Sequence, residues 1–388
     1  MLEVFLHKDP NDPDGSPVPL TLPATRHDLL AARAELRVDN LREVFVEMGA
    51  VQGYPHITAC LSQASAEDDL VGKLNCFASR LRDMTPAERW SLDALCYLCG
   101  PDNMKDLINL SYSADTLVSE PDVGNEEQLG EFLVENGFRD FPEETIPYLD
   151  FARIGRERLA ENTCGFVGNT YCEQAGDVAD IYDGVTLPAP REPDFIFQVE
   201  LAEPEHAADG DRTVKLTLPA EDDDIAAALD ALSVQSLSDC VIVNGRSGIE
   251  RFAGLLSIDT DPANLNNLAA QIAVMNDAEY IKFLAVAEHQ HALADPDPAV
   301  TLCDLAARLD DFIFEPAFTD VEQFARNELS LDCPDLLPFV NLEAYGTHWL
   351  QERGAQIGSL GYVREIISPE PAQTFAQEET FEPQLGGM

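Results

Sequence analysis

Clustered carboxylates are the side chains of this sequence that could do chemistry. The chain has 71 acidic against 24 basic residues and a net charge of −47. Two carboxylates can share acid–base work or hold a metal ion, whereas a long array is better suited to a basic protein surface. The candidate binding residues are the acids that occur in runs: Glu67, Asp68, Asp69, Glu126, Glu127, Glu131, Glu135, Asp140, Glu143, Glu144, Asp150, Glu221, Asp222, Asp223, Asp224, Asp310, Asp311, Asp320 and Glu322.

Helical spacing places some of these acids in a row. Glu127, Glu131 and Glu135 are four residues apart, so a helix would bring them to one face, where like charges cost a few tenths of a kcal/mol per pair. We interpret the row as a surface for a cationic partner. Adaptation to high salt is the alternative for the whole pattern: the count of only five lysines favours it, whereas nine cysteines and 19 phenylalanines argue against it.

The charge balance excludes direct binding to nucleic acid, which requires lysine and arginine on the phosphates. A DNA-binding protein is a fitting partner instead. DNA carries one charge per ~1.7 Å of axis, so a charge of −47 matches roughly 80 Å of duplex. The sequence contains no apolar run of about 18 residues, and its N-terminus does not resemble a signal peptide. We therefore expect a cytoplasmic protein with reduced cysteines.

Motifs for catalysis or metal binding are weak. Cys96 and Cys99 lack the second pair of a structural zinc site, and His289 and His291 would point about 200° apart on a helix. The sequence shows no phosphate-binding glycine loop, Gly-x-Ser-x-Gly or His-Glu-x-x-His. We expect no enzyme activity, metal or cofactor. The rival interpretations are a carboxylate-dependent hydrolase and an acidic scaffold that binds basic nucleoid proteins.

The elements that must position the carboxylates occur twice. IPYLDFARIGRERLAENTCGFVGNTY, 146–171, aligns with LPFVNLEAYGTHWLQERGAQIGSLGY, 337–362, and VPLTLPA, 18–24, aligns with VKLTLPA, 214–220. Similarity at a long, nearly constant shift is typical of a duplicated unit. The pattern predicts a first unit, a proline-rich linker, a second unit and a disordered polar tail, with these bounds: 1–185, 186–194, 195–366 and 367–388.

Each unit reads as α+β: a small sheet with a helix against it, then a helical block, elongated overall. Short apolar runs, such as Leu2–Leu6, predict strands at the front of each unit. Ser65 with Asp68, and Thr85 with Glu88, predict helix starts. Gly155 and Gly346 interrupt helical patterns at matching positions, which favours close packing against a neighbouring element.

The segment PYLDFARIGRERL, 147–159, together with GYV at 361–363 after LEAYGTHWL, resembles the C-terminal signature of ArdA-type antirestriction proteins. The resemblance implies an elongated acidic protein that imitates bent DNA and inhibits type I restriction-modification enzymes by filling their DNA groove. Members of that family are about half this length and generally dimerise. A fused pair would therefore present a dimer-like acidic surface in one chain. Asp150, at the family's usual acidic position, is replaced by Asn341 in the second unit.

Overall fold

The protein is described here by a computed structural model that covers residues 2–9, 16–64, 67–188, 195–207 and 212–366. By compactness the chain divides into two units, Met1–Asp277 and Ala278–Met388. We call these the first and second units of the structure; they are not the two predicted repeats, 1–185 and 195–366. The predicted α+β class is confirmed, because helices accompany four small antiparallel sheets in the described ranges. Each of these sheets has three strands.

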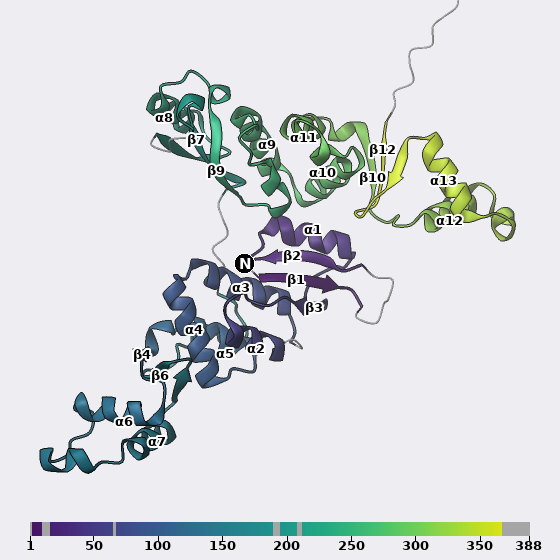
Figure 1. The fold of residues 1–388 in the computed structure, drawn as a ribbon. Coiled ribbons are helices and arrows are strands. Elements are labelled where there is room, and N and C mark those ends of the chain that lie inside the picture. Colours follow the sequence, from purple (N-terminus) through teal and green to yellow (C-terminus); the bar gives the residue numbers. More distant parts are fainter. Residues whose placement is uncertain (1, 10–15, 65–66, 189–194, 208–211, 367–388) are drawn as a thin grey trace, which may run out of the picture. The chain divides into compact units, whose positions relative to one another are not determined.

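The first sheet lies at the start of the first unit and has the strand order β2-β1-β3 (Figure 1). Leu2, Val4 and Leu6 alternate into the core, as expected for a strand with one buried face. The following helix begins at a capping box, in which Thr25 and Asp28 satisfy each other's backbone N–H groups. The elements are β1 (Leu2–His7), β2 (Val18–Leu22), α1 (Arg26–Leu36) and β3 (Phe45–Met48).

A helical block follows and shares one hydrophobic core with the first sheet. The predicted start at Thr85 is confirmed: Thr85 and Glu88 form a capping box, and Pro86 is the first helical residue. The other predicted start involves Ser65, which lies outside the described residues, and the helix there begins at Leu70. The helices are α2 (Pro55–Gln63), α3 (Leu70–Asp83), α4 (Pro86–Cys99) and α5 (Met104–Ser111).

The next segment forms a small module with its own core, which we call the α6–α7 module (residues 117–174). Its sheet has the order β4-β6-β5, and α6 and α7 lie side by side next to it (Figure 1). Leu129, Leu133, Ile154 and Tyr171 form the centre of its core. The elements are β4 (Leu117–Pro121), α6 (Glu126–Glu135), η2 (Glu143–Tyr148), α7 (Phe151–Glu161), β5 (Cys164–Val167) and β6 (Thr170–Gln174).

The last sheet of the first unit has the order β8-β7-β9. Ala220 N–H donates to Asn266 Oδ1 at 2.8 Å, and in the first half of the chain Ala24 N–H donates to Asn75 Oδ1 at 2.7 Å. The elements are β7 (Phe197–Ala202), β8 (Thr213–Leu218), α8 (Asp222–Leu232), β9 (Val241–Ser247), η5 (Glu250–Leu255) and α9 (Pro262–Val274).

The second unit pairs helices with one sheet of order β10-β12-β11. Phe324, Leu350 and Tyr362 form the core between α12, α13 and this sheet. The elements are α10 (Asp277–His289, which begins at the unit boundary), α11 (Pro298–Ala307), β10 (Phe312–Glu315), α12 (Val321–Asp332), η8 (Pro334–Phe339), α13 (Leu342–Glu352), β11 (Ala355–Ile357) and β12 (Tyr362–Glu365).

Two sheets had not been predicted, namely β4-β6-β5 and β10-β12-β11. Their strands are only three to five residues long, so their alternation was too short to detect. The predicted disordered tail, 367–388, and most of the predicted linker, 189–194, lie outside the described residues. No described helix is long and apolar enough to cross a bilayer.

Candidate partner-binding surface

Helix α6 carries a regular row of exposed carboxylates. It begins at Asn125, whose side chain accepts a hydrogen bond from Gln128 N–H. Leu129, Gly130 and Leu133 face the core of the module. The opposite side presents what we call the acidic row, Glu127, Glu131 and Glu135, all exposed. None of these three side chains forms an ion pair with a described residue.

Two glycines hold α6 tightly against α7. A Cβ atom at Gly130 would collide with the backbone carbonyl of Phe151, and one at Gly155 would collide with the backbone carbonyl of Glu126. The predicted role of Gly155 in close packing is therefore confirmed. Gly346 has the same role in the second unit, where a Cβ atom would lie 2.7 Å from the carbonyl oxygen of Val321. This packing fixes the direction in which the acidic row faces.

More exposed acids follow α6 within the same module. Asp140 lies in the loop after the helix, and Glu143 and Glu144 begin the short helix η2. Asp150 caps α7 by accepting a hydrogen bond from Arg153 N–H at 3.0 Å, yet it remains exposed. Asn341 makes the equivalent bond to Ala344 N–H, so the exchange of Asp150 for Asn341 preserves the cap and removes the charge.

A polar network anchors α7 to the sheet of the same module. Glu173 on β6 is nearly buried and binds Arg158, Tyr171 and Asn162. Burial alone would raise the pKa of Glu173, but hydrogen bonds from Tyr171, Asn162 and Arg158 together lower this pKa below its ordinary value. The carboxylate of Glu173 therefore stabilises the module and is not available to a partner.

Several of the predicted acids also have structural roles. Glu67 accepts a hydrogen bond from Met104 N–H at 2.7 Å and pairs with Lys73 at 2.8 Å, so it holds α5 to α3. Asp69 precedes α3 in a left-handed conformation. Glu126 pairs with Arg156 at 2.9 Å. Asp68, between Glu67 and Asp69, is exposed.

The predicted acids of the second half of the chain are scattered over three places. Glu221, Asp222, Asp223 and Asp224 are exposed at the start of α8, where negative charge stabilises the helix dipole. Asp310 is exposed, and Asp311 pairs with Arg308 at 2.9 Å. Asp320 caps α12 through Gln323 N–H, and Glu322 is exposed beside it.

The acidic row has no counterpart on α12. Glu322 aligns with Glu127, but the positions four and eight residues later are Arg326 and Ser330. The two halves of the chain therefore differ in the feature that suits them for a cationic partner. Eight of the predicted residues belong to the α6–α7 module, and the others are spread over several other elements.

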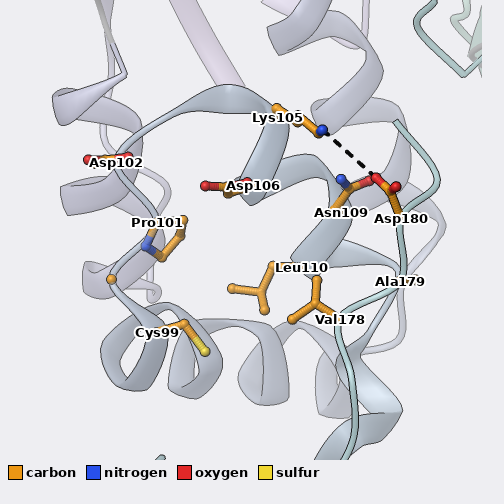
Figure 2. A pocket seen from close by; sticks show the side chains of 11 residues that line it. Cys99, Pro101, Asp102, Lys105, Asp106, Asn109, Leu110, Val178, Ala179 and Asp180 are labelled. Carbon is orange, nitrogen blue, oxygen red and sulfur yellow. Dashed lines mark ion pairs between the residues drawn. The ribbon is translucent and has the colours of Figure 1, made fainter. Parts of the chain in front are cut away.

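A cleft with a volume of ≈ 440 Å³ lies elsewhere in the first unit (Figure 2). Lys105 faces Asp180 across it at 3.9 Å. Asp106 accepts a hydrogen bond from the Asn103 side chain at 2.7 Å, and Asn109 Oδ1 accepts the N–H groups of Ile181 and Tyr182. Lys105 and Asn109 therefore hold residues 180–182 against α5 at the cleft.

All nine cysteines are free thiols. Cys96 is buried and Cys99 is exposed at the rim of the cleft. His289 contacts the side chain of Gln356, and the neighbouring Glu288 accepts a hydrogen bond from the hydroxyl of Ser359. Within the described ranges, no three His, Cys, Asp or Glu side chains are grouped so that they could hold a metal ion.

Sequence reasoning missed two exposed aromatic residues. Tyr148 at the end of η2 is 88% exposed, and Phe339 at the end of η8 is 85% exposed. They occupy the same position in the two similar segments, after Pro147 and Pro338. The two segments share a sequence signal at this position, an aromatic residue directly after proline.

Comparison with known proteins does not assign the chain to a family. No family model matches the chain, and no curated protein is similar enough to count as a match. The resemblance to ArdA-type proteins therefore rests on the quoted residues.

Proposed function

We propose that the protein is an antirestriction inhibitor, a DNA mimic whose carboxylates occupy phosphate positions on a DNA-binding defence enzyme. The observation that carries the proposal is the acidic row on α6, together with the exposed Asp140, Glu143 and Glu144 that follow it in the same module. A type I restriction-modification enzyme is the target that the resemblance to ArdA-type proteins favours. No nucleic acid, membrane, metal or cofactor takes part in this function.

The spacing of the row is compatible with this role. Glu127 and Glu135 are eight residues apart, so three charges lie along about 12 Å of helix. One strand of DNA carries a charge every ~3.4 Å of axis. The row alone therefore has a little over half the charge density of one strand, and the acids after α6 are needed to approach that of DNA.

We also infer that the chain arose by tandem duplication of an ArdA-like unit. The matching strand orders β2-β1-β3 and β8-β7-β9, and β4-β6-β5 and β10-β12-β11, support this inference. The hydrogen bond from Ala24 to Asn75 and its counterpart from Ala220 to Asn266 support it as well. Each copy of this ArdA-like unit would then meet the other at a high effective concentration within one chain, so association of separate chains would not be required.

The test is competition with DNA for the purified methyltransferase core of a type I restriction-modification enzyme, which we call the restriction core. Increasing amounts of the protein should displace a labelled duplex, and the displacement should weaken steeply with added salt as the charges are screened. The same assay with a basic nucleoid protein distinguishes the restriction inhibitor from an acidic scaffold that binds nucleoid proteins. Displacement from the nucleoid protein alone, with none from the restriction core, would overturn the proposed target.

A further inference from the structure

Tyr148 is exposed because of its place in η2. Leu149 N–H donates to Ile146 O at 3.2 Å, and both of these residues are half-buried, with Leu149 packed on the core of the α6–α7 module. Tyr148 lies between Pro147 and Leu149 and faces solvent with 88% of its surface exposed. Burial in the core of this chain therefore does not account for an aromatic residue at this position.

The surroundings of Tyr148 are strongly acidic. Asp140, Glu143, Glu144 and Asp150 lie within ten residues of it along the chain, and all are exposed. The nearest basic residue in sequence before it, Arg139, is already paired with Glu157 at 2.7 Å and with Glu161 at 3.7 Å. Arg153, after it, is 3.3 Å from Glu157. Tyr148 therefore belongs to an exposed acidic stretch of the chain, and none of its four carboxylates forms an ion pair with a described residue.

An exposed aromatic ring in an acidic stretch of the chain suits an arginine-bearing surface. Guanidinium groups stack on aromatic faces and bind carboxylates through two parallel hydrogen bonds. The chain already uses such stacking internally, since Arg80 lies 5.1 Å from the centre of the Tyr112 ring and Arg353 lies 3.7 Å from that of Trp349. Tyrosine is also among the residues that most often dominate the binding energy of interfaces.

A second copy of this chain is a poor occupant of the same surface. Docking Tyr148 against another copy would bring four exposed carboxylates towards four others, on chains that each carry a charge of −47. Like charges brought together at an interface cost several kcal/mol. Phe339 differs in part, because the exposed residues within eight positions of it along the chain include the apolar Leu331 and Leu336 besides the acidic Asp335 and Glu343.

We propose that Tyr148 is the aromatic anchor of the partner-binding surface and takes an arginine side chain of a basic protein between its ring and the carboxylates around it. This inference deepens the proposed function and rests on it for the identity of the partner. The acidic row supplies long-range attraction, and Tyr148 supplies a short-range preference for arginine over lysine.

The test uses the full chain labelled with 3-fluorotyrosine and observed by fluorine NMR. The resonance absent from Tyr148→Phe identifies Tyr148, and Tyr97, about half exposed, serves as an internal reference. Hexaarginine should shift the Tyr148 resonance saturably, with an affinity about two- to fivefold higher than that of hexalysine, which is the size of an exposed cation–π contact. The triple variant D140N/E143Q/E144Q should abolish the shift.

Three results would overturn the proposal. Hexaarginine could shift the Tyr97 resonance and leave that of Tyr148 unchanged. Hexalysine could bind as tightly as hexaarginine. The Tyr148 resonance could move with protein concentration alone, which would make a second copy the occupant.

A second arm measures binding to the restriction core. Tyr148→Ala should weaken it about tenfold and Tyr148→Phe much less, as expected for an aromatic hot spot. Phe339→Ala is the matched control with equal exposure and should have a smaller effect. A larger effect of Phe339→Ala would overturn the proposal. If the restriction core does not bind the protein at all while hexaarginine still selects Tyr148, the proposed function fails and the anchor stands.

Discussion

Arg158 on α7 and Glu173 on β6 form a two-pronged ion pair, with Arg158 Nη2 2.7 Å from Glu173 Oε1 and Arg158 Nε 3.1 Å from Glu173 Oε2. The aligned residues of the second unit are Trp349 and Arg364, so this pair is absent there. Trp349 instead packs edge-on against Phe324 at 4.8 Å. The aligned helix position thus makes a salt bridge to the sheet in one half and an aromatic contact with the neighbouring helix α12 in the other.

Replacing Glu173 with Gln should destabilise the α6–α7 module. The side chain of Glu173 is 11% exposed, and its loss would leave the guanidinium of Arg158 partly buried without a counter-charge. We expect a loss of about 2 kcal/mol in the free energy of unfolding. Urea denaturation measures it. Glu157→Gln removes an exposed partner of Arg139 and should change stability much less. Equal losses for the two variants would refute a special role for the Glu173 pair.

The same pair predicts a pH dependence of stability. The pKa of Glu173 is lowered in the folded protein because hydrogen bonds to its charged form outweigh its burial. The unfolded chain therefore takes up the proton first as the pH falls below about 4.3. The stabilisation is complete above this value and is lost as the pH falls through the lower pKa of the folded state. Melting temperatures measured between pH 3 and pH 7 should fall more for the wild type than for Glu173→Gln. Parallel curves would contradict the assignment.

Gly155→Ala should disturb the contact between α6 and α7. Its methyl group would collide with the backbone carbonyl of Glu126, which cannot move without shifting α6. Overpacking of this kind costs about 1–3 kcal/mol. Gly254→Ala is the matched control, because a Cβ atom there meets nothing within 4 Å and should be tolerated. Thermal unfolding compares the two, and a Gly155→Ala variant as stable as Gly254→Ala would show that the helices are not in close contact.

The features that the sequence predicted correctly depend on local spacing. The cap at Thr85 requires only Glu88 three residues later, and the exposure of Glu127, Glu131 and Glu135 follows from their opposition to Leu129 and Leu133 on one helix. The close packing at Gly155 was signalled by a glycine that costs stability inside a helix. Each of these signals lies within a few residues of the chain.

The features that the sequence did not reveal depend on distant partners. Glu67 belongs to a run of acids, but it binds Met104 N–H, 37 residues away. Tyr148 is not among the residues predicted for the surface, because sequence hydrophobicity does not say which apolar side chain stays outside. The hairpin of β5 and β6 did have a local signal, since Gly168 and Asn169 form a turn in which Gly168 has a φ of 61°. That turn was overlooked because its strands are so short.

Neutralising the acidic row should separate binding from stability. The variant E127Q/E131Q/E135Q removes three charges that face a partner and two like-charged pairs on one helix. We expect a loss of more than tenfold in affinity for the restriction core, because three phosphate-like charges are removed together. We expect a gain of a few tenths of a kcal/mol per pair in stability, because the repulsion is relieved. Any one of the three substitutions alone should weaken binding less than threefold, since no single charge dominates an extended surface.

The matched control is D222N/D223N/D224N, which changes the net charge by the same amount at the start of α8. These carboxylates stabilise the helix dipole, so their neutralisation should lower stability, the opposite sign to the row variant. Its effect on affinity should be small, because the three residues lie on a different sheet-and-helix unit from the acidic row. Equilibrium competition measures the affinity of both variants, and urea denaturation measures whether stability rises for the row variant and falls for the control. If both triple variants weaken binding equally, net charge and not the arrangement of carboxylates on α6 determines affinity, and the DNA-mimic proposal loses its structural basis.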